Sequence, residues 1–322
     1  MASTVTHTFF ILDVYDKLDT KTKKLLIDEK SILKSAAQGM DPFFFYKIIT
    51  PWKGKRMREF GEFFHDNYTY EFFEILINYI KYNGYARNSQ VMAFLYGTLS
   101  HYVLDSNIHP FVIYKSGVFD KNNKDSYKNN MMHEEMESMF DNYLISLRLG
   151  IKPWKFKVHK FCFEKVEFSS TFKEVIDFSF NQTFGIRNMT KFYSKALKSM
   201  KTFFIIFRDD CYGLKRKFYN IVDFICPKSF RRKTPLSYKI NLDYSMFNLE
   251  HNKWYNPTSK KIKSNKSILD IYTESVFECV SIINKINSYI YDDIGELKDI
   301  LKNDSYITGR DWTKHYELKF FE

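Results

Sequence analysis

Glycine and proline are scarce in this sequence. Only 11 glycines and 7 prolines stand among 322 residues, whereas the two together make up about 12% of an average soluble domain. So low a share argues against collagen-like, disordered and turn-rich all-β chains. No apolar run approaches the roughly 18 residues of a membrane-spanning helix, since the densest run covers only 202–207. The N-terminal segment also lacks the long apolar core of a secretory signal, because Asp13, Asp16 and Lys17 interrupt it.

Cysteine is also scarce. The four cysteines lie after residue 161, and no two of them have the Cys-x-x-Cys spacing of a zinc ribbon or a redox motif. They fit buried free thiols in a reducing compartment better than a disulfide framework. With no signal sequence visible, we expect a soluble protein of the cytoplasm.

Arginine is rare among the basic residues, with 10 arginines against 39 lysines, which weakens any interpretation based on bidentate recognition of phosphate. The net charge of +11 is unevenly placed, because residues 1–150 carry 18 basic and 18 acidic side chains. The stretch 187–239 holds 14 basic and 3 acidic residues, interleaved with aromatics. Such a stretch suits peripheral contact with an anionic membrane or a nucleic-acid backbone, and is also typical of helix faces in water.

Apolar residues recur at helical spacing along most of the chain. This periodicity predicts an all-α, multi-helix bundle, with a boundary that divides it into a core at 1–155 and a basic, mostly helical region at 156–322. Because the residue before a proline disfavours the helical backbone, one helix should end before Pro110. The best candidate strand is 158–168, and residues 228–263 resemble a loop. The predicted helices are 8–18, 62–82, 91–108, 131–149, 190–207, 214–225 and 267–291.

Histidines and carboxylates follow a repeated spacing in the first half of the chain. His101 and Asp105 are four residues apart, and so are His133 and Glu137, which places each pair on one face of a helix. Imidazoles and carboxylates are ligands that zinc accepts. Each could also be an ordinary hydrogen-bonded side chain, but so many ionisable groups on apolar helices would be costly to bury without a cation. The full set of candidates is His7, Asp41, His65, His101, Asp105, His109, His133 and Glu137.

Five motifs carry these residues: Thr6-His7, Gln38-Gly39-x-Asp41-Pro42-Phe43, Phe64-His65, Tyr96-Gly97-x-x-Ser100-His101-Tyr102-x-x-Asp105-x-x-x-His109-Pro110, and His133-x-x-x-Glu137. Through them, residues 1–150 resemble the zinc-dependent phospholipase C family of bacteria. The resemblance implies an all-α fold with a multinuclear zinc site in its core, a fold shared with single-strand nucleases of fungi and plants.

The resemblance also implies how the zinc ions are held. One set would be Asp41, His65, His101 and Asp105, a second His109, His133 and Glu137, and a third Asp105 and His7 with the family's N-terminal amine. Six residues precede His7 here, so the resemblance leaves two or three ions open. Asp41 is the implied catalytic base, with Glu134 and Glu135 as alternatives.

The implied activity is hydrolysis of a phosphodiester bond, with a phospholipid headgroup as the first candidate substrate. A single-strand nuclease or another phosphoesterase on the same fold remains an alternative, although nucleic acid is the less favoured partner. A metal-stabilised helical module without turnover is a further alternative. A His-Asp phosphohydrolase is disfavoured, because His65-Asp66 has no second histidine between it and His7.

Overall fold

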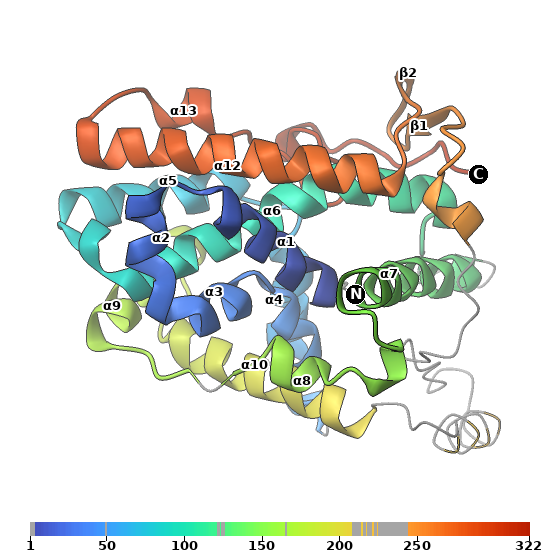
Figure 1. The fold of residues 1–322 in the computed structure, drawn as a ribbon, viewed down its shortest axis with the longest axis horizontal. Helices are drawn as coiled ribbons and strands as arrows, with labels where there is room; N and C mark the ends of the chain where they lie inside the picture. Colours follow the sequence, from blue (N-terminus) through green and yellow to red (C-terminus); the bar gives the residue numbers. More distant parts are fainter. Residues whose placement is uncertain are drawn as a thin grey trace.

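The computed structural model describes residues 4–120, 123, 126–207 and 244–322, except 49 and 165, together with the isolated positions 214, 217, 221 and 224. Helices form most of this part of the chain, so the predicted all-α class is confirmed (Figure 1). The α-helices are α1 (Thr4–Lys17), α2 (Thr20–Leu26), α3 (Lys30–Ala36), α4 (Lys55–Phe64), α5 (Thr69–Tyr82), α6 (Ser89–Ser116), α7 (Tyr127–Leu149), α8 (Val158–Phe161), α9 (Ser170–Phe184), α10 (Met189–Ile206), α12 (Ile268–Asp292) and α13 (Leu297–Ile300).

Short 3-10 helices and one small hairpin complete the described secondary structure. The 3-10 helices are η1 (Ile27–Glu29), η2 (Asp41–Phe45), η3 (Pro51–Gly54), η4 (Tyr85–Arg87), η6 (Pro153–Lys155), η8 (Tyr244–Phe247) and η9 (Trp312–Lys314). The strands β1 (Trp254–Asn256) and β2 (Ser259–Ser264) pair antiparallel. No helix in the described part of the chain is both long enough and apolar enough to cross a membrane.

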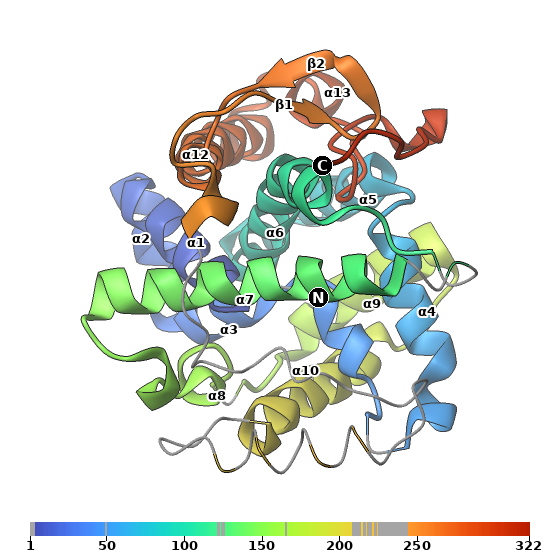
Figure 2. The ribbon, with the colours of Figure 1, turned by 90° about the vertical axis from the view of Figure 1, so that its right-hand side faces the viewer.

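Helix α6 forms the centre of the molecule. Most of its side chains are buried, and it packs against α1, α3, α7 and α12. Figure 2 shows α6 in the middle, with α7 crossing it and α12 and the hairpin on one side. The predicted end before Pro110 is wrong, because α6 continues to Ser116. Pro110 removes one N–H donor from the helix, but packing on all sides holds the helical backbone beyond it.

Two other predictions are corrected by local hydrogen bonds. The predicted helix 62–82 divides into α4 and α5, because the side chains of His65 and Asn67 bond to carbonyls in the last turn of α4. The predicted strand at 158–168 is the short helix α8 followed by loop. The strands lie instead in the region predicted as loop, where Asn256 accepts hydrogen bonds from Thr258 and closes the hairpin turn.

One hydrophobic core extends from α1 to Tyr306 and is rich in phenylalanine. Both predicted regions, 1–155 and 156–322, contribute to this core, and the boundary between them stays a prediction. Cys162 and Cys279 are buried free thiols, while the other two cysteines lie outside the described residues. The predicted helix 214–225 and the rest of the basic stretch after 207 also lie outside them, apart from the isolated positions 214, 217, 221 and 224.

Candidate metal centre

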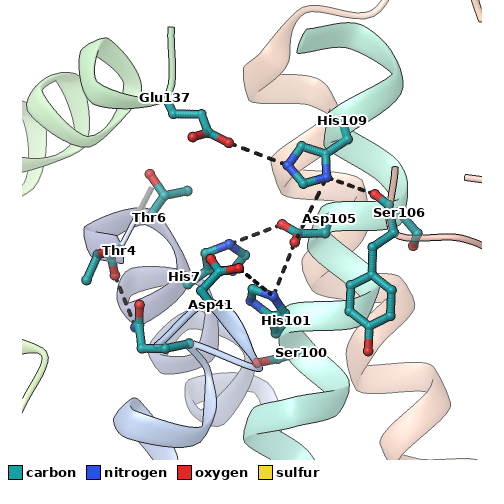
Figure 3. A network of polar contacts seen from close by, with 12 residues as sticks. Thr4, Thr6, His7, Asp41, Ser100, His101, Asp105, Ser106, His109 and Glu137 are labelled. Atoms are coloured by element: carbon teal, nitrogen blue, oxygen red, sulfur yellow. Dashed lines mark hydrogen bonds and ion pairs between the residues drawn. The ribbon is translucent and has the colours of Figure 1, made fainter. Parts of the chain in front are cut away.

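Helix α6 presents three of the predicted ligands on one face. His101, Asp105 and His109 follow one another at intervals of four residues, so their side chains leave the helix in a row. His101 Nε2 lies 3.2 Å from Asp105 Oδ2, and His109 Nδ1 lies 4.0 Å from the same oxygen. His101 is fully buried and Asp105 is 3% exposed. Figure 3 shows these side chains facing Asp41, His7 and Glu137 from other elements.

Asp41 and His65 form the first group with His101. Asp41 begins η2, and His65 is the residue at which α4 ends. His65 Nε2 lies 3.0 Å from Asp41 Oδ1 and 3.5 Å from His101 Nε2. Because a carbonyl can only accept, His65 donates from Nδ1 to the carbonyl of Gly61 at 2.6 Å. This hydrogen bond leaves Nε2 of His65 to face the group.

Gly39 allows the ring of His101 to lie against the turn that precedes Asp41. Gly39 has a φ of +51°, in the left-handed region that favours glycine. A Cβ at this position would overlap the His101 ring. The Gln38-Gly39-x-Asp41 motif therefore requires glycine at its second position, because a side chain there would displace the ring of His101.

His7 forms the second group with Asp105 and His101. His7 lies on α1 and is 2% exposed. Its Nε2 lies 3.1 Å from Asp105 Oδ1, and its ring centroid lies 4.3 Å from that of His101. Asp105 therefore turns one oxygen to His7 and the other to His101, so its carboxylate stands between the two groups.

The third group joins α6 to α7. His133 and Glu137 leave α7 one turn apart, with His133 Nε2 at 3.2 Å from Glu137 Oε1. His109 Nε2 lies 3.4 Å from the same oxygen. His109 donates from Nδ1 to the carbonyl of Tyr306 at 2.8 Å, which leaves its Nε2 for the group.

Asp141 ties α1 to α7 beside this centre. It follows Glu137 by one helical turn and accepts hydrogen bonds from the backbone N–H of Val5 at 3.2 Å and of Thr6 at 2.7 Å. The hydroxyl of Thr6 donates to it as well. Burial raises the pKa of Asp141 to about 7. Asp141 thus fixes the first turn of α1, directly before His7.

The candidate ligand atoms lie within 4.8 Å of one another in each of the three groups. A family model for zinc-dependent phospholipase C matches residues 6–192, which is more than half of the chain. The chain belongs to the zinc-dependent phospholipase C family. No curated protein and no solved structure matches it. The predicted resemblance is confirmed, and the match extends beyond the predicted end at residue 150, through α9 to the start of α10.

The protonation states in this member of the family fit a site built for cations. Burial lowers the pKa of His101 to about 4, so its imidazole is neutral near pH 7. Burial raises the pKa of Asp105, but the neighbouring His101 and His109 lower it further, and it ends below its ordinary value. Burial lowers the pKa of both His65 and His109, but Asp41 and Asp105 together raise that of His65 above its ordinary value, and Asp105 and Glu137 together raise that of His109 to about 9. Imidazole protons thus balance the buried carboxylates, and a divalent cation can replace these protons.

The donor set fits zinc. Asp41 Oδ2 is buried and has no hydrogen-bond partner among the described residues. In the same part of the chain, only histidines form ion pairs with Asp41 and Asp105. Two carboxylates buried without lysine or arginine are unfavourable unless a cation is held between them. Imidazole nitrogen and carboxylate oxygen are ligands that zinc accepts.

A cavity of about 330 Å³ opens beside the centre. Its polar lining residues are Asp41, Glu62, His65, His109, Asn129 and His133, and its apolar ones are Phe44, Ile113, Val118, Phe119, Ile307 and Leu318. No lysine or arginine is found among the described residues that line it. Acidic and imidazole side chains therefore share this cavity with apolar ones.

No motif in the sequence indicated the C-terminal residues of the site. Tyr306 contacts His65 and His109, and Ile307 and Leu318 line the cavity, although residues beyond 292 show no recognisable motif. Their one signal was the apolar pair at 306–307 within a polar segment. Glu134, Glu135 and Asp66 do not line the cavity, and Asp66 and Glu135 are exposed.

Proposed function

We propose that this zinc hydrolase cleaves the phosphodiester bond of a phospholipid headgroup, as a phospholipase C does. The observation that carries the proposal is the cavity, which the candidate ligands share with apolar side chains. A phosphate held at the candidate ligands would leave the glycerolipid part of the substrate beside apolar side chains such as Ile113 and Phe119. Such contacts favour an apolar leaving group over a water-soluble one.

We assign the three groups as the zinc ligands, with two or three ions bound. Asp41, His65, His101 and Asp105 would hold the first ion, and His109, His133 and Glu137 would hold the second. Asp105 also lies beside His7, so these two would contribute to a third site. Zinc bound there supplies a Lewis acid for phosphoryl oxygens and a water that is nucleophilic near neutral pH.

We assign Asp41 as the catalytic base. Its Oδ1 faces His65, whereas its Oδ2 has no hydrogen-bond partner among the described residues. Burial raises the pKa of Asp41, but His101 and His65 lower it further, so the carboxylate is ionised at neutral pH. Oδ2 is therefore the oxygen that receives the proton of the attacking water. His65 and His101 hold the carboxylate in place for that step.

The basic stretch 187–239 supports a second element of the proposal, peripheral contact with an anionic membrane. Within its described part, α10 exposes Lys191, Lys195 and Lys198, while Tyr193 and Met200 are buried against the core. Cationic side chains near an anionic surface each contribute about 1 kcal/mol to binding, less at high salt. The buried free thiols support a reducing compartment, and we accordingly propose the cytoplasm as the site of action.

A substrate comparison tests the proposed function. We would measure hydrolysis of phosphatidylcholine vesicles, a small soluble phosphodiester and single-stranded DNA, each with and without added zinc. The proposal expects zinc-dependent release of the phosphorylated headgroup, with DNA left intact. Asp41→Asn should abolish this release, whereas Asp66→Asn, a matched change at an exposed position, should not.

Each alternative makes a different prediction in the same experiment. Zinc-dependent cleavage of DNA, with the lipid left intact, would favour the single-strand nuclease. Zinc binding without turnover of any of the three substrates would favour a metal-stabilised module.

A further inference from the structure

The segment 305–309 reaches the metal centre from outside the part of the chain that matches the family. The match ends at residue 192, whereas Tyr306 is fully buried beside the ligands. Its backbone N–H donates to the carbonyl of His65 at 3.0 Å, and its carbonyl accepts from His109 Nδ1 at 2.8 Å. One residue therefore holds a candidate ligand of the first group and one of the third.

The ring of Tyr306 packs against the same centre. Its centroid lies 5.1 Å from that of His65 and 5.8 Å from that of His101. It also lies 5.1 Å from the centroid of the Tyr102 ring. The hydroxyl of Tyr306 is buried and has no hydrogen-bond partner among the described residues. Tyr306 thus acts through its ring and its main chain, and the hydroxyl has no visible role.

The segment itself is held firmly. Ser305 Oγ accepts hydrogen bonds from the N–H of Ile307 and of Thr308, and Asn256 donates to the carbonyl of Thr308 at 3.1 Å. Gly309 has a φ of +61°, and a Cβ there would overlap the carbonyl of Ser106 on α6. This contact sets the distance between the segment and α6, the helix that carries His109.

We propose that Tyr306 is a positioning residue for the metal centre. Its carbonyl fixes the Nδ1–H tautomer and the ring plane of His109, so that Nε2 faces Glu137. Its ring fixes the plane of His65, whose Nε2 faces Asp41. The proposal rests on the assignment of these histidines as zinc ligands. Loss of a partner that orients a ligand lowers metal affinity by about 10–100-fold.

Two variants and two controls test the proposal. Tyr306→Ala removes the ring, and Gly309→Ala displaces the segment from α6. Tyr306→Phe keeps the ring and the main chain and should therefore bind zinc with wild-type affinity. Gly185→Ala is the matched control for Gly309→Ala, because Gly185 has a φ of +66° but no atom within 4 Å of an added Cβ.

The readouts are zinc affinity by competition with a chelating dye and the absorption spectrum of the cobalt-substituted protein, with folding checked by circular dichroism. We expect Tyr306→Ala and Gly309→Ala to lose about 10–100-fold in affinity for at least one ion and to show a changed cobalt spectrum. Should Tyr306→Ala fail to fold, Gly309→Ala decides the question.

Unchanged affinity and spectrum in a folded Gly309→Ala protein, together with a wild type that binds zinc, would overturn this inference and leave the proposed function standing. A wild-type protein that binds no zinc would overturn both. A Tyr306→Phe protein as impaired as Tyr306→Ala would also contradict the inference, because it would assign the effect to the hydroxyl.

Discussion

The family-matched region and the C-terminal segment contribute to the metal centre in different ways. Residues 6–192 supply every candidate ligand side chain, from α1, η2, α4, α6 and α7. The segment 305–309 supplies no candidate ligand, but its main chain bonds to His65 and His109. The difference teaches that the chemistry of such a site can belong to one region while its geometry depends on another.

Removal of zinc is expected to have the largest effect. The ligands come from elements far apart in sequence, so bound metal stabilises the contacts among these elements. With zinc at about a thousand times its dissociation constant, each site adds about 4 kcal/mol to the free energy of unfolding. We expect chelation to lower the melting temperature markedly. Metal analysis that finds no zinc, with an unchanged melting temperature under chelator, would contradict this.

Substitutions of ligand residues should remove more bound zinc than substitutions of the residues that position them. We expect His101→Ala and Asp105→Asn each to lose bound zinc, because both side chains stand between groups. Gly39→Ala should do the same, since a Cβ there would overlap the ring of His101. Variants of Tyr306 should only weaken binding. Metal content measured after dialysis separates the two classes, and equal losses would remove the distinction.

Acidification should weaken zinc binding. The pKa of His109 is raised to about 9, so near neutral pH zinc must displace its proton. Affinity should therefore rise up to about tenfold per pH unit from pH 7 towards pH 9. Isothermal titration in buffers of different ionisation enthalpy would measure the released protons. Affinity that does not change with pH would show that His109 is not a ligand.

The stability of the metal-free protein should fall as the pH rises, whereas zinc affinity rises. A pKa raised in the folded state stabilises the fold below the unfolded value of about 6.5, and this stabilisation is lost as the pH rises to about 9. The melting temperature of the chelated protein should therefore fall over this range, while that of the zinc-loaded protein does not. Parallel curves would contradict the assignment.

A substitution at Asp141 tests the family-matched region without the C-terminal segment. Asp141→Ala would leave the buried N–H groups of Val5 and Thr6 without their acceptor, which destabilises by about 2–3 kcal/mol. The control is Asp16→Ala, which removes an exposed carboxylate from α1, the helix that Asp141 holds. Urea unfolding measures both, and equal stabilities would show that Asp141 does not fix α1.

The smallest effect should come from the lysines of α10. Changing Lys191, Lys195 and Lys198 to glutamine should weaken salt-sensitive binding to anionic vesicles without altering hydrolysis of a soluble phosphodiester. The control makes the same charge change on the exposed strand β2, at Lys260, Lys261 and Lys263. Vesicle co-sedimentation compares the two variants. An equal loss of vesicle binding in both would show that net charge, and not the position of the lysines on α10, determines binding.

The sequence allowed prediction of the parts of the site that follow helical periodicity. His101, Asp105 and His109 share a face because four residues make about one turn, and this needs no tertiary information. The predicted helices 131–149 and 267–291 correspond to α7 and α12, and the structure shows a left-handed glycine at the end of α7 and a capping box at the start of α12.

The rest depended on contacts that no local pattern encodes. Pro110 stays helical because α6 is packed on all sides, which overrides the local preference for an extended backbone. Both hydrogen bonds of Tyr306 to the centre are made by backbone atoms, which every residue has, so its side chain gives no signal of them. The cavity is lined in part by Ile307 and Leu318, which are distant in sequence from the motifs.

The hydrogen bond between His109 and Tyr306 also bears on the order of folding. It joins residues 197 positions apart, whereas His133 and Glu137 are four apart on one helix. Closing a long loop costs more chain entropy than closing a short one. We therefore expect the helical ligand pairs to form before the segment that orients them docks, and the cobalt spectrum to report the completion of the native state. A cobalt spectrum that becomes native before the helices do would contradict this order.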